Sequence, residues 1–238
     1  PIFWDAWDVE LYHLEKYDYL DKECRVEIMT TGPLTASLER TVKISAVSSI
    51  VQSITLDCLS TKVVFETRVK WYESRKMLKV EFPVDIYTDQ ATYETQYGLI
   101  HRPTAMDTSW DVARFEVCGL RFMALQEHRF GVALLSDSKY GYSVSDKHRM
   151  RLSLLRSPKD PDPECDMGEH VLKFAVMPIG DVMEAIKESR QLSTPLLWWT
   201  GKSCVDSSWS SHPLVSTMDQ SDTLVLDTVK QPESSGKG

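Results

Sequence analysis

The sequence has 238 residues, of which 42% are hydrophobic and 26% are charged, so it can form one large domain or two small ones and is not disordered throughout. Basic residues number 27 against 35 acidic ones, and the net charge of −8 argues against a nucleic-acid or anionic-membrane partner bound through bulk charge. No apolar run approaches the roughly 18 to 20 residues that span a bilayer, and the start of the chain does not resemble a signal peptide.

Alternating apolar and polar residues predict that most of the chain forms β-strands. The first such pattern covers residues 38–44. The clearest two cover residues 63–71 and 80–86, and we expect the polar residues 73–76 between them to form a hairpin connection. A further strand is predicted over residues 113–117.

Residues 128–156 predict a meander of three strands. These are an apolar strand over 130–135, a second over 140–144 and an alternating strand over 150–154, separated by turn sequences rich in Ser and Asp. An exposed acidic loop with three prolines follows, and then a strand over 170–177.

One short helix is predicted near residues 181–191. Asp181 followed by Glu184 resembles a capping box, in which the Asp carboxylate accepts hydrogen bonds from backbone N–H groups at the helix start. We therefore predict an all-β, mainly antiparallel fold, a large β-sandwich over residues 1–200. Residues 201–238 are predicted to form a linker rich in Ser, Thr and Asp and the start of a truncated β segment, with a strand over 223–230.

The cysteines and the first residue bear on the setting of the chain. The five cysteines are widely spaced and include no Cys-x-x-Cys pair, so neither a zinc ribbon nor a disulfide framework is predicted. The chain contains no asparagine and so no N-glycosylation sequon. Both observations favour a cytoplasmic location. The first residue is Pro1 rather than Met, which favours a segment of a longer protein.

No catalytic motif is found, and the six histidines lack metal-ligand spacing, so the site must be sought elsewhere. Aromatic and acidic side chains gather at the start of the chain, in Trp4, Asp5, Trp7 and Asp8. A ring face can cover the C–H groups of a sugar, and carboxylates accept hydrogen bonds from its hydroxyls. The alternative is a strand or turn held by two buried Trp rings, with its carboxylates in solvent.

Arg156 is the second candidate, because it follows Leu152 and Leu154 on the apolar side of its predicted strand. An unpaired arginine cannot face the core. We expect Arg156 either to leave the strand end, where a nearby carboxylate holds it, or to be paired in a cleft. Pro158 should end the strand directly afterwards, since proline cannot donate to the ladder.

Several segments, taken in order, resemble the C-terminal β region of glycoside hydrolase family 38 α-mannosidases, and most closely the cytosolic (neutral) branch. They follow the order of the family over nearly the whole chain. These segments are residues 3–10, 12–15, 71–82, 91–104, 108–117, 130–141, 152–158 and 225–234.

The resemblance implies part of a retaining exo-α-mannosidase that acts on mannose-containing oligosaccharides. In such an enzyme an aspartate attacks the anomeric carbon, and a bound zinc, or cobalt in some members, holds the mannose hydroxyls. The nucleophile and the metal ligands belong to an N-terminal barrel and helical bundle, which are the expected partners of this chain and lie outside it. We therefore expect no catalytic and no metal-binding residue here, and no activity from the chain alone.

The resemblance also implies site residues, because the β region of the family packs on the barrel and walls the active-site cleft. An arginine at the place of Arg156 approaches the cleft, and the segment with Trp4, Asp5, Trp7 and Asp8 follows the helical bundle. These five residues are our candidates for the substrate cleft. Two other functions stay open: a non-catalytic carbohydrate-binding or scaffold sandwich, and an inactive truncated product.

The chain departs from the family over residues 120–127, where His-Arg-Trp-x-Asp-Leu-Ser-Glu is expected. Of that pattern only Arg121, Leu125 and Glu127 remain. Losing a His and an Asp together indicates a divergent member or a relaxed polar network between the sheets.

Overall fold

A computed structural model describes residues 4–21, 24–146, 148–198, 200–201, 228 and 230. The helices and strands in these ranges belong to one compact unit that ends at Leu196, and a second unit begins at Leu197. The linker and β segment predicted over 201–238, with the strand over 223–230, lie outside the described residues apart from three isolated positions.

In chain order the elements are η1 (Leu11–Leu14), β1 (Cys24–Thr31), β2 (Thr35–Lys43), β3 (Ser49–Asp57), β4 (Val63–Trp71), β5 (Met77–Pro83), β6 (Gln90–Thr95), β7 (Gly98–Pro103), α1 (Ser109–Ala113), β8 (Val117–Cys118), β9 (Phe122–Glu127), β10 (Phe130–Ser136), β11 (Gly141–Ser145), β12 (Arg149–Arg156), β13 (Gly168–Ile179) and α2 (Val182–Ser193).

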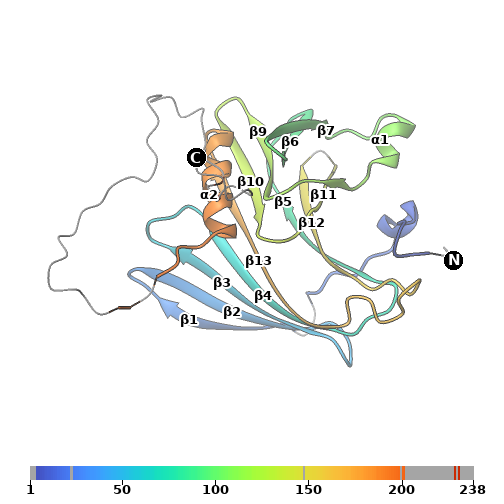
Figure 1. Cartoon of the computed structure of the whole chain (residues 1–238), viewed down its shortest axis with the longest axis horizontal. Coiled ribbons are helices and arrows are strands. Elements are labelled where there is room, and N and C mark those ends of the chain that lie inside the picture. The colour runs from blue at the N-terminus through green and yellow to red at the C-terminus, as the bar shows by residue number, and fades with distance from the viewer. Residues whose placement is uncertain are drawn as a thin grey trace, which may run out of the picture. The chain divides into compact units, whose positions relative to one another are not determined.

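The strands form two antiparallel sheets. The large sheet has nine strands in the order β1-β2-β3-β4-β13-β10-β9-β6-β7, and the small sheet has four in the order β5-β12-β11-β8. Figure 1 shows β1 to β4 and β13 in the lower part of the unit, with β5, β11 and β12 of the small sheet above them. The predicted all-β, mainly antiparallel sandwich is confirmed.

Aromatic side chains join the two sheets at the centre of the sandwich. Phe65 of β4 stacks on Phe174 of β13 at 5.1 Å between ring centroids, and Phe82 of β5 contacts Phe65 from the other sheet at 5.4 Å. They belong to a core that also contains Trp71 and Tyr142. Burying each ring stabilises the fold by about 1.5–3 kcal/mol, so this contact holds the small sheet on the large one.

The opposite face of the large sheet carries α2. There Ala124, Ala133 and Ala175 of three neighbouring strands are buried with Ala185 and Leu192 of the helix. Alanine side chains are short, so the helix can approach the strands closely. The predicted short helix is confirmed, and Asp181 accepts a hydrogen bond from the N–H of Met183 at 2.7 Å. No helix in the described part of the chain is long and apolar enough to cross a membrane.

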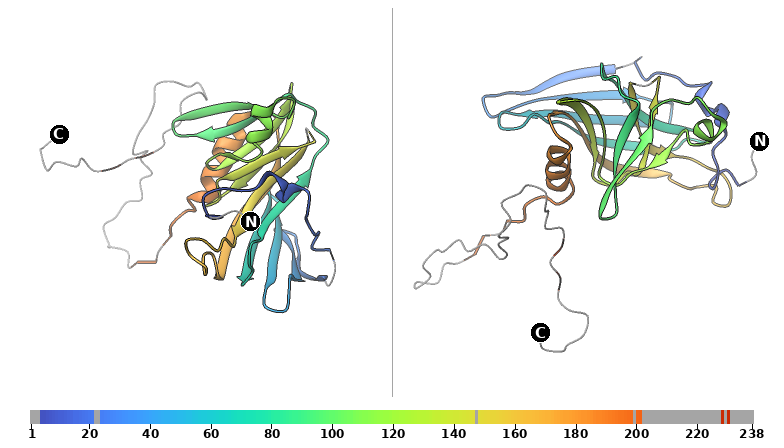
Figure 2. Two further views of the ribbon diagram at one scale, coloured as in Figure 1. Left: turned by 90° about the vertical axis from the view of Figure 1, so that its right-hand side faces the viewer. Right: turned by 90° about the horizontal axis from the view of Figure 1, so that it is seen from above.

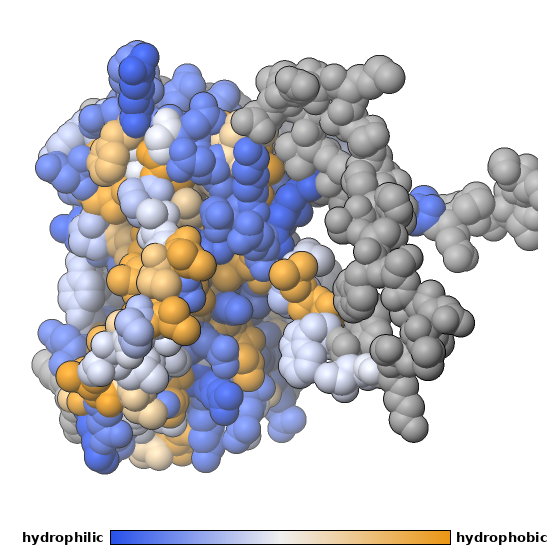
Figure 3. All heavy atoms as spheres, turned by 90° about the vertical axis from the view of Figure 1, so that its left-hand side faces the viewer, coloured by the Kyte–Doolittle hydropathy of each residue, from blue (hydrophilic) through white to orange (hydrophobic). Residues whose placement is uncertain are grey.

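The small sheet covers only part of the large one, because it has four strands against nine. Figure 2 shows β1, in blue, at the border of the large sheet. Figure 3 views the unit from the left-hand end of β1 to β4 in Figure 1, and apolar side chains gather in the middle of that surface. β1 is exposed along its whole length, so the β1 border of the large sheet is more exposed than its centre.

The predicted hairpin between residues 63–71 and 80–86 is wrong. β4 pairs with β3 and β13 in the large sheet, whereas β5 pairs with β12 in the small sheet. The connection crosses from one sheet to the other, and its Glu73 is buried and forms an ion pair with Lys76 at 2.8 Å. Alternation shows which side of a strand is buried but does not show which strand lies next to it, so a crossover and a hairpin look alike in sequence.

The predicted meander is correct only in its second half. β11 and β12 form a hairpin, but β10 pairs with β9 and β13 in the large sheet. The strand predicted over 113–117 is also wrong, since Ser109–Ala113 is the helix α1 and only Val117–Cys118 is a strand. Thr108 and Asp111 form a capping box at the start of α1, and that local bonding outweighs the alternation.

Candidate functional site

The site lies on the outer face of the small sheet, which the N-terminal segment crosses. Figure 2, left, shows this segment in blue in front of the yellow strands of the small sheet. His13 of η1 packs against Phe115 with 5.1 Å between ring centroids. Burial lowers the pKa of His13, and the nearby Lys79 acts in the same direction, whereas the Glu10 carbonyl and Glu116 oppose it.

A row of charged side chains from β5 and β12 lies on this outer face. Glu81 accepts hydrogen bonds from Arg149 at 2.9 Å and from Arg151 at 2.5 Å. Burial raises the pKa of Glu81, but these two guanidinium groups outweigh burial and hold the pKa below its ordinary value. Next along the row, Lys79 forms an ion pair with Glu116. The charges pair with one another and leave Arg156 at the end of the row.

A β-bulge turns Arg156 to this outer face. Ser153 is opposite Lys79 and Leu155 is opposite Leu78, so Leu154 is an extra residue in β12. Leu155 is therefore buried on the inner side, and Arg156 faces outward. Our assignment of Arg156 to the apolar side was wrong, because a one-residue bulge reverses the alternation after it. The strand does end at Arg156, as predicted.

The guanidinium of Arg156 holds the N-terminal segment. Its Nη2 donates hydrogen bonds to the backbone carbonyls of Asp5 and Asp8. A carboxylate is also present, as expected, but Asp166 accepts from the backbone N–H of Arg156 at 3.1 Å. Arg156 thus positions residues 5–8 against the end of β12.

Asp5 binds the loop that follows β12. Its Oδ1 accepts hydrogen bonds from the N–H groups of Lys159 and Asp160, both at 2.8 Å, and its Oδ2 lies 3.5 Å from Nε of Arg75. Burial raises the pKa of Asp5, but these donors with the charges of Arg75 and Arg156 outweigh burial and lower the pKa below the ordinary value of 3.8. The anionic carboxylate is thus bound within the chain.

The two tryptophans of the segment are not buried. Trp7 is 79% exposed and Trp4 is more than half exposed, with 6.0 Å between their ring centroids and 36° between their planes. The alternative of two buried rings therefore does not hold. Asp8 is exposed, and its carboxylate accepts from the adjacent N–H of Val9 at 2.8 Å.

A pocket of about 190 Å³ lies between the segment, the β4–β5 connection and the end of β12. Ser157 is fully buried, and its Oγ, like Nε2 of His13, has no hydrogen-bond partner among the described residues. The structure brings three of our five candidates to this pocket, which is lined by Asp5, Asp8, Val9, Glu10, His13, Arg75, Lys76, Met77, Arg156, Ser157 and Pro158.

Sequence reasoning missed His13, Arg75 and Ser157. His13 lay in the resembling segment 12–15, but nothing local marked it as a site residue. Arg75 was assigned to a hairpin turn, and Ser157 adjoins Arg156 without a motif of its own. Their meeting depends on pairing between distant segments, which local patterns do not contain.

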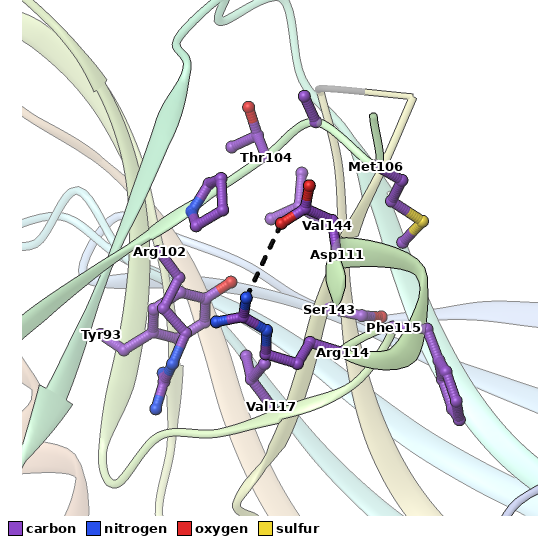
Figure 4. Close-up of a pocket in the computed structure, with 12 residues that line it drawn as sticks. Tyr93, Arg102, Thr104, Met106, Asp111, Arg114, Phe115, Val117, Ser143 and Val144 are labelled. Carbon is purple, nitrogen blue, oxygen red and sulfur yellow. Dashed lines mark ion pairs between the residues drawn. The ribbon is translucent and has the colours of Figure 1, made fainter. Parts of the chain in front are cut away.

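A smaller pocket lies beside α1, and Figure 4 shows Arg114 reaching across it to Asp111. The two side chains are 3.9 Å apart, and the guanidinium of Arg102 lies over the Tyr93 ring at 4.8 Å. Burial raises the pKa of Tyr93 to about 12, against an opposing effect of Arg102. With a volume of only about 30 Å³, this pocket is too small for a sugar or a cofactor, and we assign it no binding role.

Over residues 120–127, where the chain departs from the expected pattern, Arg121 is held in an ion pair. Arg121 binds Glu94 of β6, with Nη2 at 2.5 Å from Oε1 and the backbone N–H at 2.9 Å from Oε2. Glu94 is buried, so this pair joins β6 to the start of β9. No group of three His, Cys, Asp or Glu side chains that could hold a metal ion occurs among the described residues.

Residues 1–164 match the family model of the glycosyl hydrolases family 38 C-terminal domain. The chain is 44% identical to alpha-mannosidase 2C1 of Homo sapiens over 240 residues, which cover 99% of this chain and 22% of that protein. It is 44% identical to an alpha-mannosidase of Saccharomyces cerevisiae over 185 residues, 75% of this chain and 17% of that protein. The chain thus spans about a fifth of the length of these relatives.

The fold is similar to part of the crystal structure of an alpha-mannosidase from Enterococcus faecalis. The TM-score is 0.66, at 15% sequence identity, and the match covers 72% of this chain and 24% of that chain.

Proposed function

The chain belongs to glycosyl hydrolase family 38, and we propose that it is the β-sandwich part of an α-mannosidase that hydrolyses terminal α-mannosides with retention of configuration. The observation that carries the proposal is the 44% identity, over 99% of this chain, to a protein named alpha-mannosidase 2C1. The substrates would be mannose-containing oligosaccharides, bound by the full-length enzyme. A cytoplasmic location is part of the proposal, and the four cysteines described are free thiols, which suits a reducing compartment.

The reacting groups would come from a part of the enzyme outside this chain. Retaining hydrolysis needs two carboxyl groups roughly 5–5.5 Å apart, one as nucleophile and one as acid/base. The carboxylate of Asp5 is bound by two backbone N–H groups, so it does not suit either role. The described residues do not fit a zinc or cobalt ion either, because they contain no cluster of ligands. We assign the nucleophile and the metal to the barrel and the helical bundle.

The role proposed for this chain is to wall the substrate cleft with the segment from Trp4 to Asp8. The exposed faces of Trp4 and Trp7 can cover the apolar side of a sugar ring, and the carboxylate of Asp8 can accept from its hydroxyls. Arg156 would act as a positioning residue, since its guanidinium already binds the carbonyls of Asp5 and Asp8.

Trp7→Ala in the full-length enzyme tests this role. We expect KM for a mannose-containing oligosaccharide to rise roughly three- to tenfold with little change in kcat, because one stacking surface is lost. Trp7→Phe should keep most of the affinity. Trp110→Ala is the matched control, since Trp110 on α1 is 76% exposed against 79% for Trp7. If both Ala variants behave alike, Trp7 does not border the cleft.

Mannosidase activity is tested separately on the full-length enzyme. The anomer formed first from an aryl α-mannoside, followed by NMR, should be the α anomer. The isolated chain is the baseline, and we expect no turnover from it above buffer. Inversion, or turnover by the isolated chain, would contradict the proposal.

A non-catalytic carbohydrate-binding sandwich is the second candidate, because the two exposed tryptophan rings could serve binding alone. Titrating the isolated chain with a mannoside, followed by tryptophan fluorescence, separates the two. Binding by the isolated chain, together with a full-length protein that has no mannosidase activity, would favour this second function.

A further inference from the structure

Within the described ranges, the first strand of the large sheet is an exposed edge. Four strands end the two sheets: β1 and β7 in the large one, β5 and β8 in the small one. Proteins usually protect such edges with Pro, charged side chains (Lys above all), β-bulges or short length. β7 and β5 end in Pro103 and Pro83, and β8 has two residues. β1 has eight residues, all exposed, with neither Pro nor Lys. It does carry the charges of Arg25 and Glu27 and a bulge at Met29, which leave residues 24–28 as a regular edge.

The inner side of β1 carries Val26 and Ile28, beside Cys24, whose Sγ accepts a hydrogen bond from Nε of Arg40 at 3.2 Å. Ile28 is opposite Leu38 of β2 and continues the row of inward side chains that ends at Phe174. Phe174 is 1% exposed under the small sheet, whereas Ile28 is 76% exposed and Val26 of the same strand is 56% exposed. An exposed apolar strip along an open edge is a feature of interaction surfaces.

The charges of β1 are complementary to those of a second copy of the same strand. Arg25 and Glu27 form an ion pair on the outer face of β1. If two copies pair antiparallel with Val26 opposite Val26, each Arg25 lies opposite the Glu27 of the other copy, and the pair occurs twice. Centring the pairing on residue 25 or 27 instead would oppose two arginines or two glutamates. The regular part of β1, residues 24–28, is symmetric about Val26 and ends before the bulge at Met29.

We propose that β1 is a self-pairing edge, through which two copies of this chain form a two-fold symmetric dimer with Val26 at the axis. The inner faces of both copies then lie on one side, so that Ile28 of each copy adjoins Cys24 of the other. The backbone of each edge gains hydrogen-bond partners, and the opposed charges select the register.

Charge reversal tests the register. Sedimentation velocity over a hundredfold dilution series should show the unaltered chain dimerising. Arg25→Glu and Glu27→Arg should each weaken the dimer by roughly tenfold or more, because like charges then face each other twice. An equal mixture of the two variants should dimerise again, since one chain carries two acidic side chains and the other two basic ones. Loss of the ion pair within each chain cannot produce this recovery.

Val26→Lys tests the axis, and Val171→Lys is its matched control. Val171 is 66% exposed on β13, inside the sheet rather than at its edge. The first variant should be monomeric and the second should dimerise, with unchanged circular dichroism in both. A monomer at every concentration of the unaltered chain would overturn the proposal and leave β1 to another segment of the full-length polypeptide. No recovery in the mixture, or equal dissociation by both lysine variants, would also overturn it.

Discussion

Phe174 in the middle of the large sheet and Ile28 at its border belong to one row of apolar side chains, yet Phe174 is 1% exposed and Ile28 is 76% exposed. Each follows a charged residue, Lys173 or Glu27, and precedes an apolar one, Ala175 or Met29, so the local sequence does not separate the two positions. The difference comes from the small sheet, which covers Phe174 through Phe82 and does not extend over β1. The order of apolar and polar residues in a strand shows which side turns inward. Whether that side is buried depends on the segment that packs over it, which lies elsewhere in the chain.

Truncating the two ends of this row, Phe174 and Ile28, gives the largest expected effect. Phe174→Ala removes a ring from the centre of the core and should lower the free energy of unfolding by about 3–5 kcal/mol. Ile28→Ala should lower it by less than about 1 kcal/mol, since little burial is lost. Urea unfolding followed by circular dichroism measures both. Equal losses would show that the border is covered in solution.

Glycine substitutions extend the same comparison with a smaller effect. A Cβ at Gly131 in β10 would lie 2.6 Å from the carbonyl oxygen of Leu125 and 3.0 Å from Cα of Gln126, and such backbone atoms cannot move aside easily. Gly131→Ala should therefore cost about 1–3 kcal/mol. Gly98→Ala on the outer strand β7 meets nothing within 4 Å and should change stability by less than about 1 kcal/mol. Thermal unfolding compares the pair, and a neutral Gly131→Ala would contradict close packing of β9 on β10.

The parts predicted correctly from sequence depend on local patterns. Alternation identified β4 and β12, and the helix start at Asp181 was recognised from its cap. The same signature at Thr108 was overlooked because the alternation beyond it was read as a strand.

The misplaced features depend on contacts between distant segments. The partners of β4 are β3 and β13, and β13 lies about a hundred residues further along the chain, so the supposed hairpin to β5 was wrong. The bulge at Leu154 is visible only in the register against β5, and it decided the face of Arg156. For the candidate site, aromatic and acidic composition marked the segment from Trp4 to Asp8, but the pocket with Arg75 and Ser157 forms only through folding.

The N-terminal segment covers part of the outer face of the small sheet, and polar contacts hold its residues 5–8 in place. Asp5 anchors it through the N–H groups of Lys159 and Asp160. Because the pKa of Asp5 is lower in the folded chain than its ordinary 3.8, the ionised carboxylate stabilises the segment above that pH. This contribution is lost as the pH falls through the lower, folded value.

Asp5→Asn should therefore destabilise the segment by about 1 kcal/mol at pH 7, because hydrogen bonds to a charged acceptor become neutral ones. The difference between Asp5→Asn and the unaltered chain should close as the pH falls through the lowered pKa of Asp5, because the carboxyl then becomes uncharged like the amide. Hydrogen exchange of peptides from residues 4–15 measures it, and peptides from β13 should not change, since apolar packing holds that strand. Asp8→Asn is the control, since that carboxylate accepts from the adjacent Val9 and is not bound to the loop after β12. Exchange that rises equally in β13 would mean that Asp5 stabilises the whole sandwich, and a difference that persists at low pH would mean that its charge is not the cause.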